Sequence, residues 1–471
     1  MSSFSWIDRR PTAMTRRDAL RTMGSGFGML GFAGLIGRAA PLAGPLDPKP
    51  THFPARAKHV IFLFLNGGPS QVDTFDPKPM LTKYHGKPMP TANLKTERRT
   101  GALLASPFRF RKCGQSGIEV SEIFPMLGDR IDDVCVIRSM HAERPNHEPS
   151  LLMLNSGRML PGHPSLGAWL TYGLGTENQN LPGYVVMCPG VPVIGPQLWS
   201  SGYLPALHQG VYLPTTEKEP EKLIPYLTNP KLGRQEQRRQ LDLLGKLNQL
   251  HLDRSGPDTQ LESSIQSMEI AFRMQSEAMD ALDISKESEA ARERYGEGAF
   301  ARGCLMARRL VERGVRIVQI YFGNGQPWDN HDDILIHRRL ARQADRPMAA
   351  LLDDLKSTGL FKETIVLIGG EFGRTPSVEV SGLVAVQNGR DHNNHGYSTL
   401  LAGGGIKGGI TYGATDEFGF KAVEKPVHAH DLHATMLHLM GLDHTRLTYR
   451  YSGRDNRLTD VEGRVLGEIL A

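Results

Sequence analysis

The feature that most constrains the fold is an apolar run near the C-terminal end of the chain. Four consecutive apolar residues, Ile365 to Ile368, have no polar residue between them, a pattern typical of a strand that is buried on both faces of a parallel sheet. Glu371 and a histidine-rich segment, 389–396, follow. Open α/β sheets bind ligands beyond the carboxyl ends of such strands, and zinc or manganese accepts both carboxylate and imidazole ligands. The stretch therefore predicts a metal site on an α/β scaffold.

Other apolar runs alternate with helical patterns along the chain. The strand-like runs are 59–65, 134–137, 183–187, 315–322 and 398–402. Strands that alternate with helices of ten or more residues indicate an α/β fold, with a mostly parallel sheet and helices on both faces.

The region 229–301 has a different composition, because it is rich in charged residues and poor in glycine. Two amphipathic patterns there, separated by Ser255-Gly256-Pro257, predict two long helices. We expect a helical insertion within one α/β domain that spans 46–471. A structural helical pair is the simpler interpretation, and a lid over the sheet is the alternative.

The N-terminus has the pattern of an export signal. Arg16 and Arg17 precede a glycine-rich apolar run, 23–36, which is followed by small residues and prolines. Paired arginines before such a run resemble a twin-arginine signal, so we expect residues 1–45 to be a signal and leader and the protein to be periplasmic or extracellular. The run is shorter than the roughly 20 residues of a membrane span. A retained N-terminal anchor is the alternative, and it would be the chain's only link to a membrane.

Composition excludes some functions. The net charge of +5 is small and dispersed, which gives no reason to expect nucleic acid as a partner. The four cysteines have no C-x-x-C spacing, so neither a zinc ribbon nor a thiol-redox motif is indicated. The sequence alone does not decide whether the cysteines form disulfides. It also does not decide whether other exported proteins are partners.

Four polar clusters follow predicted strand ends. They contain Asp73, His147, the pair Asp329 and His331, and finally Glu371 with 391–395. Each residue alone is explained equally well as a helix cap or a solvated side chain. Because the carboxyl ends of parallel strands meet at one edge of a sheet, the four clusters together predict a metal or anion site.

Several segments resemble a known group of enzymes. Residues 147–158 resemble the sulfatase signature, and 397–409 with 427–442 are similar to the C-terminal core of sulfatases and alkaline phosphatases. Together with 66–78 and 370–376, the pattern resembles an uncharacterised family of exported bacterial proteins allied to sulfatases, within the alkaline phosphatase-like superfamily. The resemblance spans roughly 59–470.

This resemblance implies a set of metal ligands but no standard nucleophile. The superfamily nucleophile falls on His147, its first-strand aspartate falls on Asn66, and no cysteine lies where formylglycine would form. The implied metal ligands form two sets. The first consists of Asp329, His331 and His395, and the second, which is rearranged, consists of Asp73, His147 and Glu371. His392 is a further candidate.

The resemblance implies a hydrolase of sulfate or phosphate esters, on small molecules or polysaccharides, that uses zinc, manganese or calcium. Because the nucleophile is missing, a water activated by the metal would attack the ester, and Arg374 and Lys407 would stabilise the anionic group. His147 is then either a catalytic residue or, more simply, a metal ligand. The alternative is a binding or scaffold protein that keeps the fold and a structural metal but has no activity.

Overall fold

The computed structural model describes residues 46–471, apart from 92–93, 225–230, 257–258 and 381–387. The predicted signal and leader, residues 1–45, lie outside the described residues. In the part of the chain that is described, no helix is both long and apolar enough to cross a membrane.

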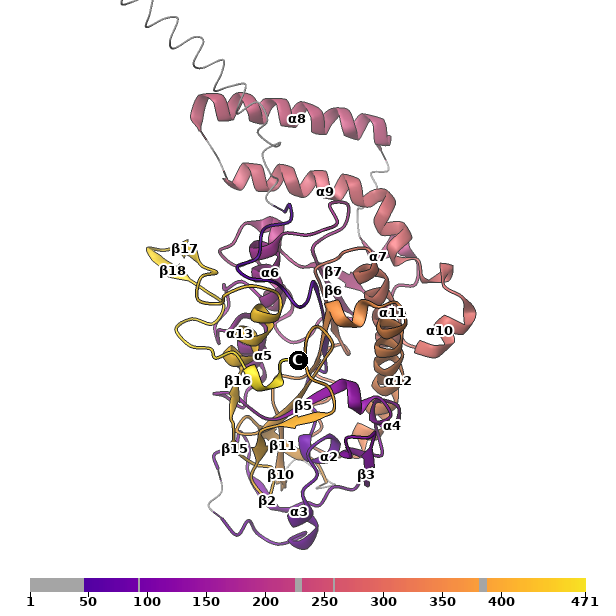
Figure 1. The fold of residues 1–471 in the computed structure, drawn as a ribbon, viewed down its shortest axis with the longest axis vertical. Coiled ribbons are helices and arrows are strands. Elements are labelled where there is room, and N and C mark those ends of the chain that lie inside the picture. The colour runs from indigo at the N-terminus through magenta and orange to yellow at the C-terminus, as the bar shows by residue number, and fades with distance from the viewer. Residues whose placement is uncertain (1–45, 92–93, 225–230, 257–258, 381–387) are drawn as a thin grey trace, which may run out of the picture. The chain divides into compact units, whose positions relative to one another are not determined.

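The centre of the fold is a mixed sheet with helices packed around it (Figure 1). Among the described residues it has nine strands, in the order β13-β5-β12-β9-β1-β8-β6-β7, with β16 paired to β5. The strands are β1 (His59–Phe64), β5 (Val134–His141), β6 (Tyr184–Cys188), β7 (Val211–Pro214), β8 (Ile317–Tyr321), β9 (Thr364–Gly369), β12 (Tyr397–Ala402), β13 (Ile410–Tyr412) and β16 (Val427–His428). The strands from β9 to β7 are parallel, and β12 runs antiparallel to both β9 and β5. The predicted mostly parallel sheet is confirmed.

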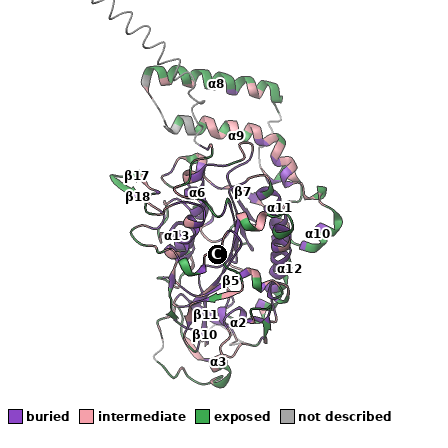
Figure 2. Cartoon of the chain, in the orientation of Figure 1, coloured by how far each residue is buried: buried purple, intermediate pink, exposed green. Residues whose placement is uncertain are grey.

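Helices cover both faces of this sheet. In β1, Ile61 and Leu63 pack into one apolar core, whereas Val60, Phe62 and Phe64 pack into the other. The first core includes residues of α11 (Ala299–Glu312) and α12 (Ile336–Ser357), and the second includes residues of α5 (His147–Ser156), α6 (Leu166–Leu174) and α13 (Ala429–Leu439). The central strands are therefore buried throughout (Figure 2), which explains their lack of polar alternation.

One edge of the sheet collects the polar segments. Because β1, β5, β8 and β9 run in the same direction, their carboxyl ends meet at this edge, where the antiparallel β12 begins. A small sheet of β10 (Gly373–Glu379), β11 (Arg390–Asn393) and β2 (Thr100–Leu103) follows β9 directly. The predicted convergence of strand ends is thus present.

The charged region after residue 229 contains α8 (Arg234–Ser255) and α9 (Thr259–Leu282). Arg238 of α8 forms an ion pair with Glu269 of α9, and α8 is exposed along most of its length (Figure 2).

The four cysteines are buried and unpaired, so no disulfide links them in this structure.

Candidate metal centre

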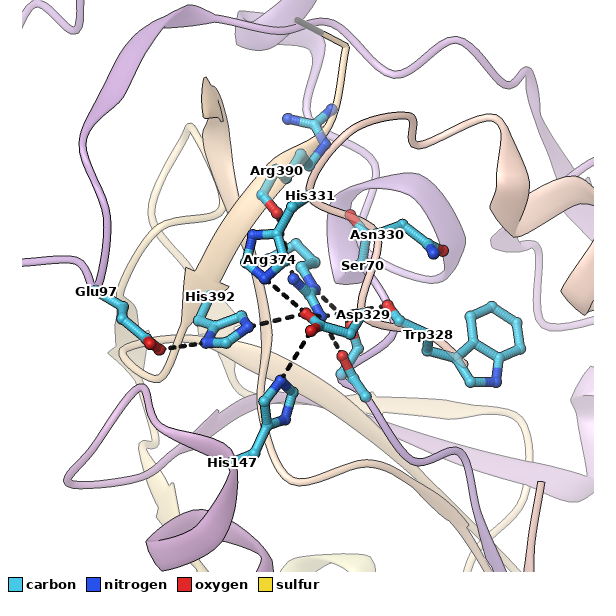
Figure 3. Close-up of polar contacts among 12 residues, drawn as sticks. Ser70, Glu97, His147, Trp328, Asp329, Asn330, His331, Arg374, Arg390 and His392 are labelled. Carbon is cyan, nitrogen blue, oxygen red and sulfur yellow. Dashed lines mark hydrogen bonds and ion pairs between the residues drawn. The ribbon is translucent and has the colours of Figure 1, made fainter. Parts of the chain in front are cut away.

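Four residues from three separate segments meet at the polar edge of the sheet. Asp329 and His331 lie in the loop that follows β8, His147 begins α5 after β5, and His392 lies in β11. The three imidazole rings surround the Asp329 carboxylate (Figure 3). We call these four residues the Asp329 site.

Each ring directs its Nε2 atom at this carboxylate. The Nε2 atoms of His331 and His392 lie 2.8 and 2.9 Å from Asp329 Oδ1, and that of His147 lies 3.3 Å from Oδ2. Ligand atoms of His147, Asp329 and His392 all lie within 4.8 Å of one another, a spacing that a single ion can bridge.

A carboxylate also faces the Nδ1 atom of each ring. Glu371 Oε1 lies 2.7 Å from Nδ1 of His147, and Glu379 contacts Nδ1 of His331. The same atom of His392 faces Glu97 at 2.6 Å. Since a carboxylate only accepts hydrogen bonds, Nδ1 of each ring carries a proton, so Nε2 is the nitrogen that can offer a lone pair to a metal.

This arrangement fits a metal ion. Nε2 of His147 and Nε2 of His331 are buried beside Asp329 oxygens but form no well-aligned hydrogen bond, which is costly for buried polar atoms unless something else binds them. A histidine that binds a metal through one nitrogen typically donates a hydrogen bond from the other to a carboxylate. The Asp329 site has this arrangement three times.

The charges of the site are strongly coupled. Burial lowers the pKa of His147, but hydrogen bonds with Asp329 and Glu371 outweigh burial and raise it to about 9. Burial raises the pKa of Asp329, but its bonds with the three histidines and the charge of Arg374 hold it well below its usual range. The Asp329 carboxylate is therefore ionised, and a cation that binds beside it would displace the Nε2 proton of His147.

Arg374 positions Asp329, and its guanidinium is enclosed by protein groups. Its side chain is 0% exposed, and it donates to Asp329 Oδ1 at 2.7 Å, to Gly68 O at 2.8 Å and to Trp328 O at 3.2 Å. The prediction that Arg374 binds the anionic group of an ester is corrected, because the protein itself occupies this guanidinium.

The turn after β1 requires glycine for the site to form. Gly67 has a φ of +114°, and a Cβ atom there would lie 2.6 Å from the backbone nitrogen of Asp329. The Gly67 N–H also donates to Glu371 Oε1 at 3.0 Å. Any other residue would strain the backbone and push the Asp329 loop away.

The structure brings together only part of the predicted set. Asp329, His331, His392 and His147 meet, and Glu371 orients His147 through Nδ1. His147 thus lies with Asp329 as a candidate ligand, which is the simpler of the two predicted roles.

Three predicted residues lie outside the Asp329 site. Asp73 is fully buried, and Arg390 donates to both of its carboxylate oxygens, so it forms an internal ion pair. His395 faces the carbonyl of Lys95. Lys407 comes after the end of β12, at the opposite edge of the sheet, and donates to the exposed carbonyl of Glu468, which corrects its predicted role at this site.

Sequence reasoning missed Glu97 and Glu379, which hold two of the three rings. Glu379 ends β10, and the sequence of this strand has no apolar run that marks it as buried or links Glu379 to His331. Glu97 lies in a segment without periodicity, and nothing in the sequence links it to His392.

Comparisons with solved structures find distant likenesses. A sulfatase from Pseudoalteromonas sp. has 12% identity and a TM-score of 0.33, with 82% of this chain and 68% of that chain covered. A phosphonate monoester hydrolase from Silicibacter pomeroyi has 10% identity and a TM-score of 0.34, covering 74% and 71%. A lipoteichoic acid synthase from Listeria monocytogenes has 10% identity and a TM-score of 0.35, covering 88% and 78%. Likenesses this distant carry no argument about chemistry.

No curated protein matches the chain. A family model described as "Protein of unknown function (DUF1501)" matches residues 57–470, which is nearly all of the described part of the chain. The protein therefore belongs to the DUF1501 family.

Proposed function

We propose that this protein is an exported, metal-dependent hydrolase of sulfate or phosphate esters. The observation that carries the proposal is the Asp329 site, where three Nε2 atoms and one ionised carboxylate converge. Small-molecule and polysaccharide esters are both within the proposed substrate class.

The ligand atoms favour zinc or manganese over calcium. Three imidazole nitrogens suit zinc and similar transition metals, whereas calcium prefers six to eight oxygen ligands. A divalent cation bound here supplies Lewis-acid chemistry, because it polarises an ester oxygen and lowers the pKa of water towards about 7.

The protein's own residues hold and orient this chemistry. The Glu371, Glu379 and Glu97 carboxylates fix the proton of each ring on Nδ1, so that all three Nε2 atoms remain ligands. Arg374 fixes the Asp329 carboxylate from the buried side. Asp329 is 23% exposed, so solvent reaches this carboxylate from its other side.

The start of α5 adds a feature suited to an anion. His147 is the first residue of this ten-residue helix, so the positive end of the helix dipole lies beside the Asp329 site. Negative charge is stabilised at such a position, which supports an anionic ester as substrate.

The test combines metal content with ester hydrolysis. A His331→Ala, His392→Ala variant should lose the equivalent of zinc or manganese that the Asp329 site holds, and also its hydrolysis of p-nitrophenyl sulfate and p-nitrophenyl phosphate. His395→Ala is the matched control, since His395 is close in sequence but bonds elsewhere, and it should retain both. Hydrolysis that survives loss of the metal would contradict the proposal. Metal retained without hydrolysis of any ester would favour the alternative, a scaffold with a structural metal.

The export part of the proposal rests on the arginine pair near the N-terminus. Replacing Arg16 and Arg17 with lysine in the full chain should retain the protein in the cytoplasm, which cell fractionation can measure. Unchanged export of this variant would show that the twin-arginine route is not used.

A further inference from the structure

A second cluster of histidines and carboxylates lies at the start of α13. His428 ends β16 and His430 is the second residue of α13, while Glu143 follows β5 and Glu462 lies in the C-terminal segment. Ligand atoms of His428, His430 and Glu462 lie within 4.8 Å of one another. We call these four residues the His430 site.

His430 has an unpartnered nitrogen inside this cluster. Its Nε2 lies 2.9 Å from the carbonyl oxygen of Gly157. Since a carbonyl only accepts, Nε2 carries the proton, and Nδ1 has the lone pair. Nδ1 is buried without a hydrogen-bond partner, and the side chain is only 8% exposed.

The nearest charged group to this lone pair is a carboxylate. A Glu462 oxygen lies 3.5 Å from His430 Nδ1, so two acceptors face each other with no donor between them. This arrangement is unfavourable unless a cation lies between the two atoms. A proton could satisfy this single pair, but a metal ion could also bind the neighbouring groups.

His428 supplies the second imidazole. Its Nδ1 accepts the backbone N–H of His430 at 3.2 Å, so the Nε2 atom carries the proton and donates it to Glu143 Oε1 at 2.7 Å. A metal that binds Nε2 would displace this proton to solvent, as metal binding to histidine commonly does. Glu143 would then become a second carboxylate ligand.

The backbone next to Glu462 passes close to the start of α13. Gly463 has a φ of +97°, and a Cβ atom there would lie 3.0 Å from the carbonyl oxygen of His430. The next residue, Arg464, donates its backbone N–H to Asp431 Oδ1 at 2.7 Å. The C-terminal segment therefore passes closely over the first turn of α13 and keeps Glu462 beside His430.

We propose that His428, His430, Glu462 and Glu143 form a second site for a divalent cation, separate from the Asp329 site. Two imidazoles and two carboxylates are a donor set that zinc accepts in tetrahedral geometry. The positive end of the α13 dipole opposes a cation here, and the Glu143, Glu462 and Asp431 carboxylates offset it. The bound ion ties the end of β5 and the C-terminal segment to α13, and this role does not depend on the proposed hydrolase activity.

The test counts zinc in a background where the Asp329 site is disabled. The full-length protein with His331→Ala and His392→Ala is stripped with a chelator, titrated with zinc and analysed by calorimetry and elemental analysis. We expect one equivalent to remain. Adding Glu462→Gln should weaken its binding at least about tenfold, the smallest loss that outer-shell changes at metal sites cause, and adding His430→Gln should abolish it. Since Glu462 is 66% exposed, its substitution should leave the fold intact, which circular dichroism and thermal unfolding check.

The matched control is His444→Gln, because His444 bonds to Thr459 near the same segment but has no part in the cluster. It should retain zinc in the same background. The inference is overturned if this background binds no zinc, or if Glu462→Gln and His430→Gln bind it as tightly as the control. Wild-type protein that binds one equivalent, lost with His331 and His392, would overturn this inference and leave the Asp329 site standing. An unchanged zinc content in that double variant would instead count against the Asp329 site.

Discussion

Asp73 and Asp329 are two carboxylates that follow adjacent parallel strands, β1 and β8, yet Asp73 is fully buried, Asp329 is 23% exposed, and their partners differ. Both accept hydrogen bonds from a fully buried arginine, Arg390 for Asp73 and Arg374 for Asp329. Arg390 and the Ser70 hydroxyl satisfy both oxygens of Asp73. Asp329 receives one arginine nitrogen and otherwise faces the Nε2 atoms of three rings. The comparison shows that the partners of a carboxylate, and not its place at the sheet edge, separate an internal ion pair from a candidate metal ligand.

The largest effect that we expect on stability comes from Asp73→Asn. Because Arg390 would keep its buried charge without a counter-ion, the free energy of unfolding should fall by about 3–5 kcal/mol. Urea denaturation measures this loss, and elemental analysis of the remaining folded protein should find the metal of the Asp329 site unchanged. Loss of the metal at an unchanged free energy of unfolding would contradict this assignment, because it would identify Asp73 as a metal ligand.

The next largest effect should be on metal affinity, and it should come from the carboxylates that accept the Nδ1 protons of the histidines. Glu379→Gln should weaken metal binding by about 10–100-fold, or about 1.4–2.7 kcal/mol, because an amide holds the Nδ1 proton of His331 less firmly than a carboxylate. Competition with a chromogenic chelator measures the affinity.

Glu97→Gln is the matched comparison and should have a smaller effect. Glu97 is 30% exposed, and the carbonyl oxygen of Pro145 lies 2.7 Å from the same Nδ1 atom of His392, which offers a second acceptor. If Glu97→Gln and Glu379→Gln lose equal amounts of metal affinity, the burial of a carboxylate does not determine how much its contact with the histidine contributes to metal binding.

The smallest effect should come from Lys407→Ala. Lys407 is exposed at the opposite edge of the sheet from both carboxylates, so the free energy of unfolding should change by less than about 0.5 kcal/mol. Ester hydrolysis should stay at the parent rate in a direct assay. A large loss of hydrolysis would mean that Lys407 contributes to the site after all.

The sequence was sufficient for the sheet and for the four residues of the Asp329 site. The apolar runs at 59–65 and 364–369 are long enough to mark buried strands, and parallel direction then brings Asp329, His331 and His147 to one edge. These inferences needed only local periodicity and one rule of topology.

The remaining contacts depend on tertiary structure that no local pattern encodes. Nothing near Asp73 indicates that Arg390, more than 300 residues later, neutralises it. Glu97 and His392 are likewise distant in sequence, and Lys407 seemed close to the site only because the reversal of direction at β12 is not visible in its sequence. The pairing of side chains from distant segments at this edge of the sheet decides which polar residues are candidate metal ligands.

The most direct test is anomalous diffraction from crystals of the full protein grown with zinc, recorded on both sides of the zinc absorption edge. The account predicts a zinc peak about 2.0–2.2 Å from Nε2 of His147, His331 and His392 and from an Asp329 oxygen, and no peak at Asp73. A crystal that shows zinc elsewhere but none among these four residues would contradict the metal centre.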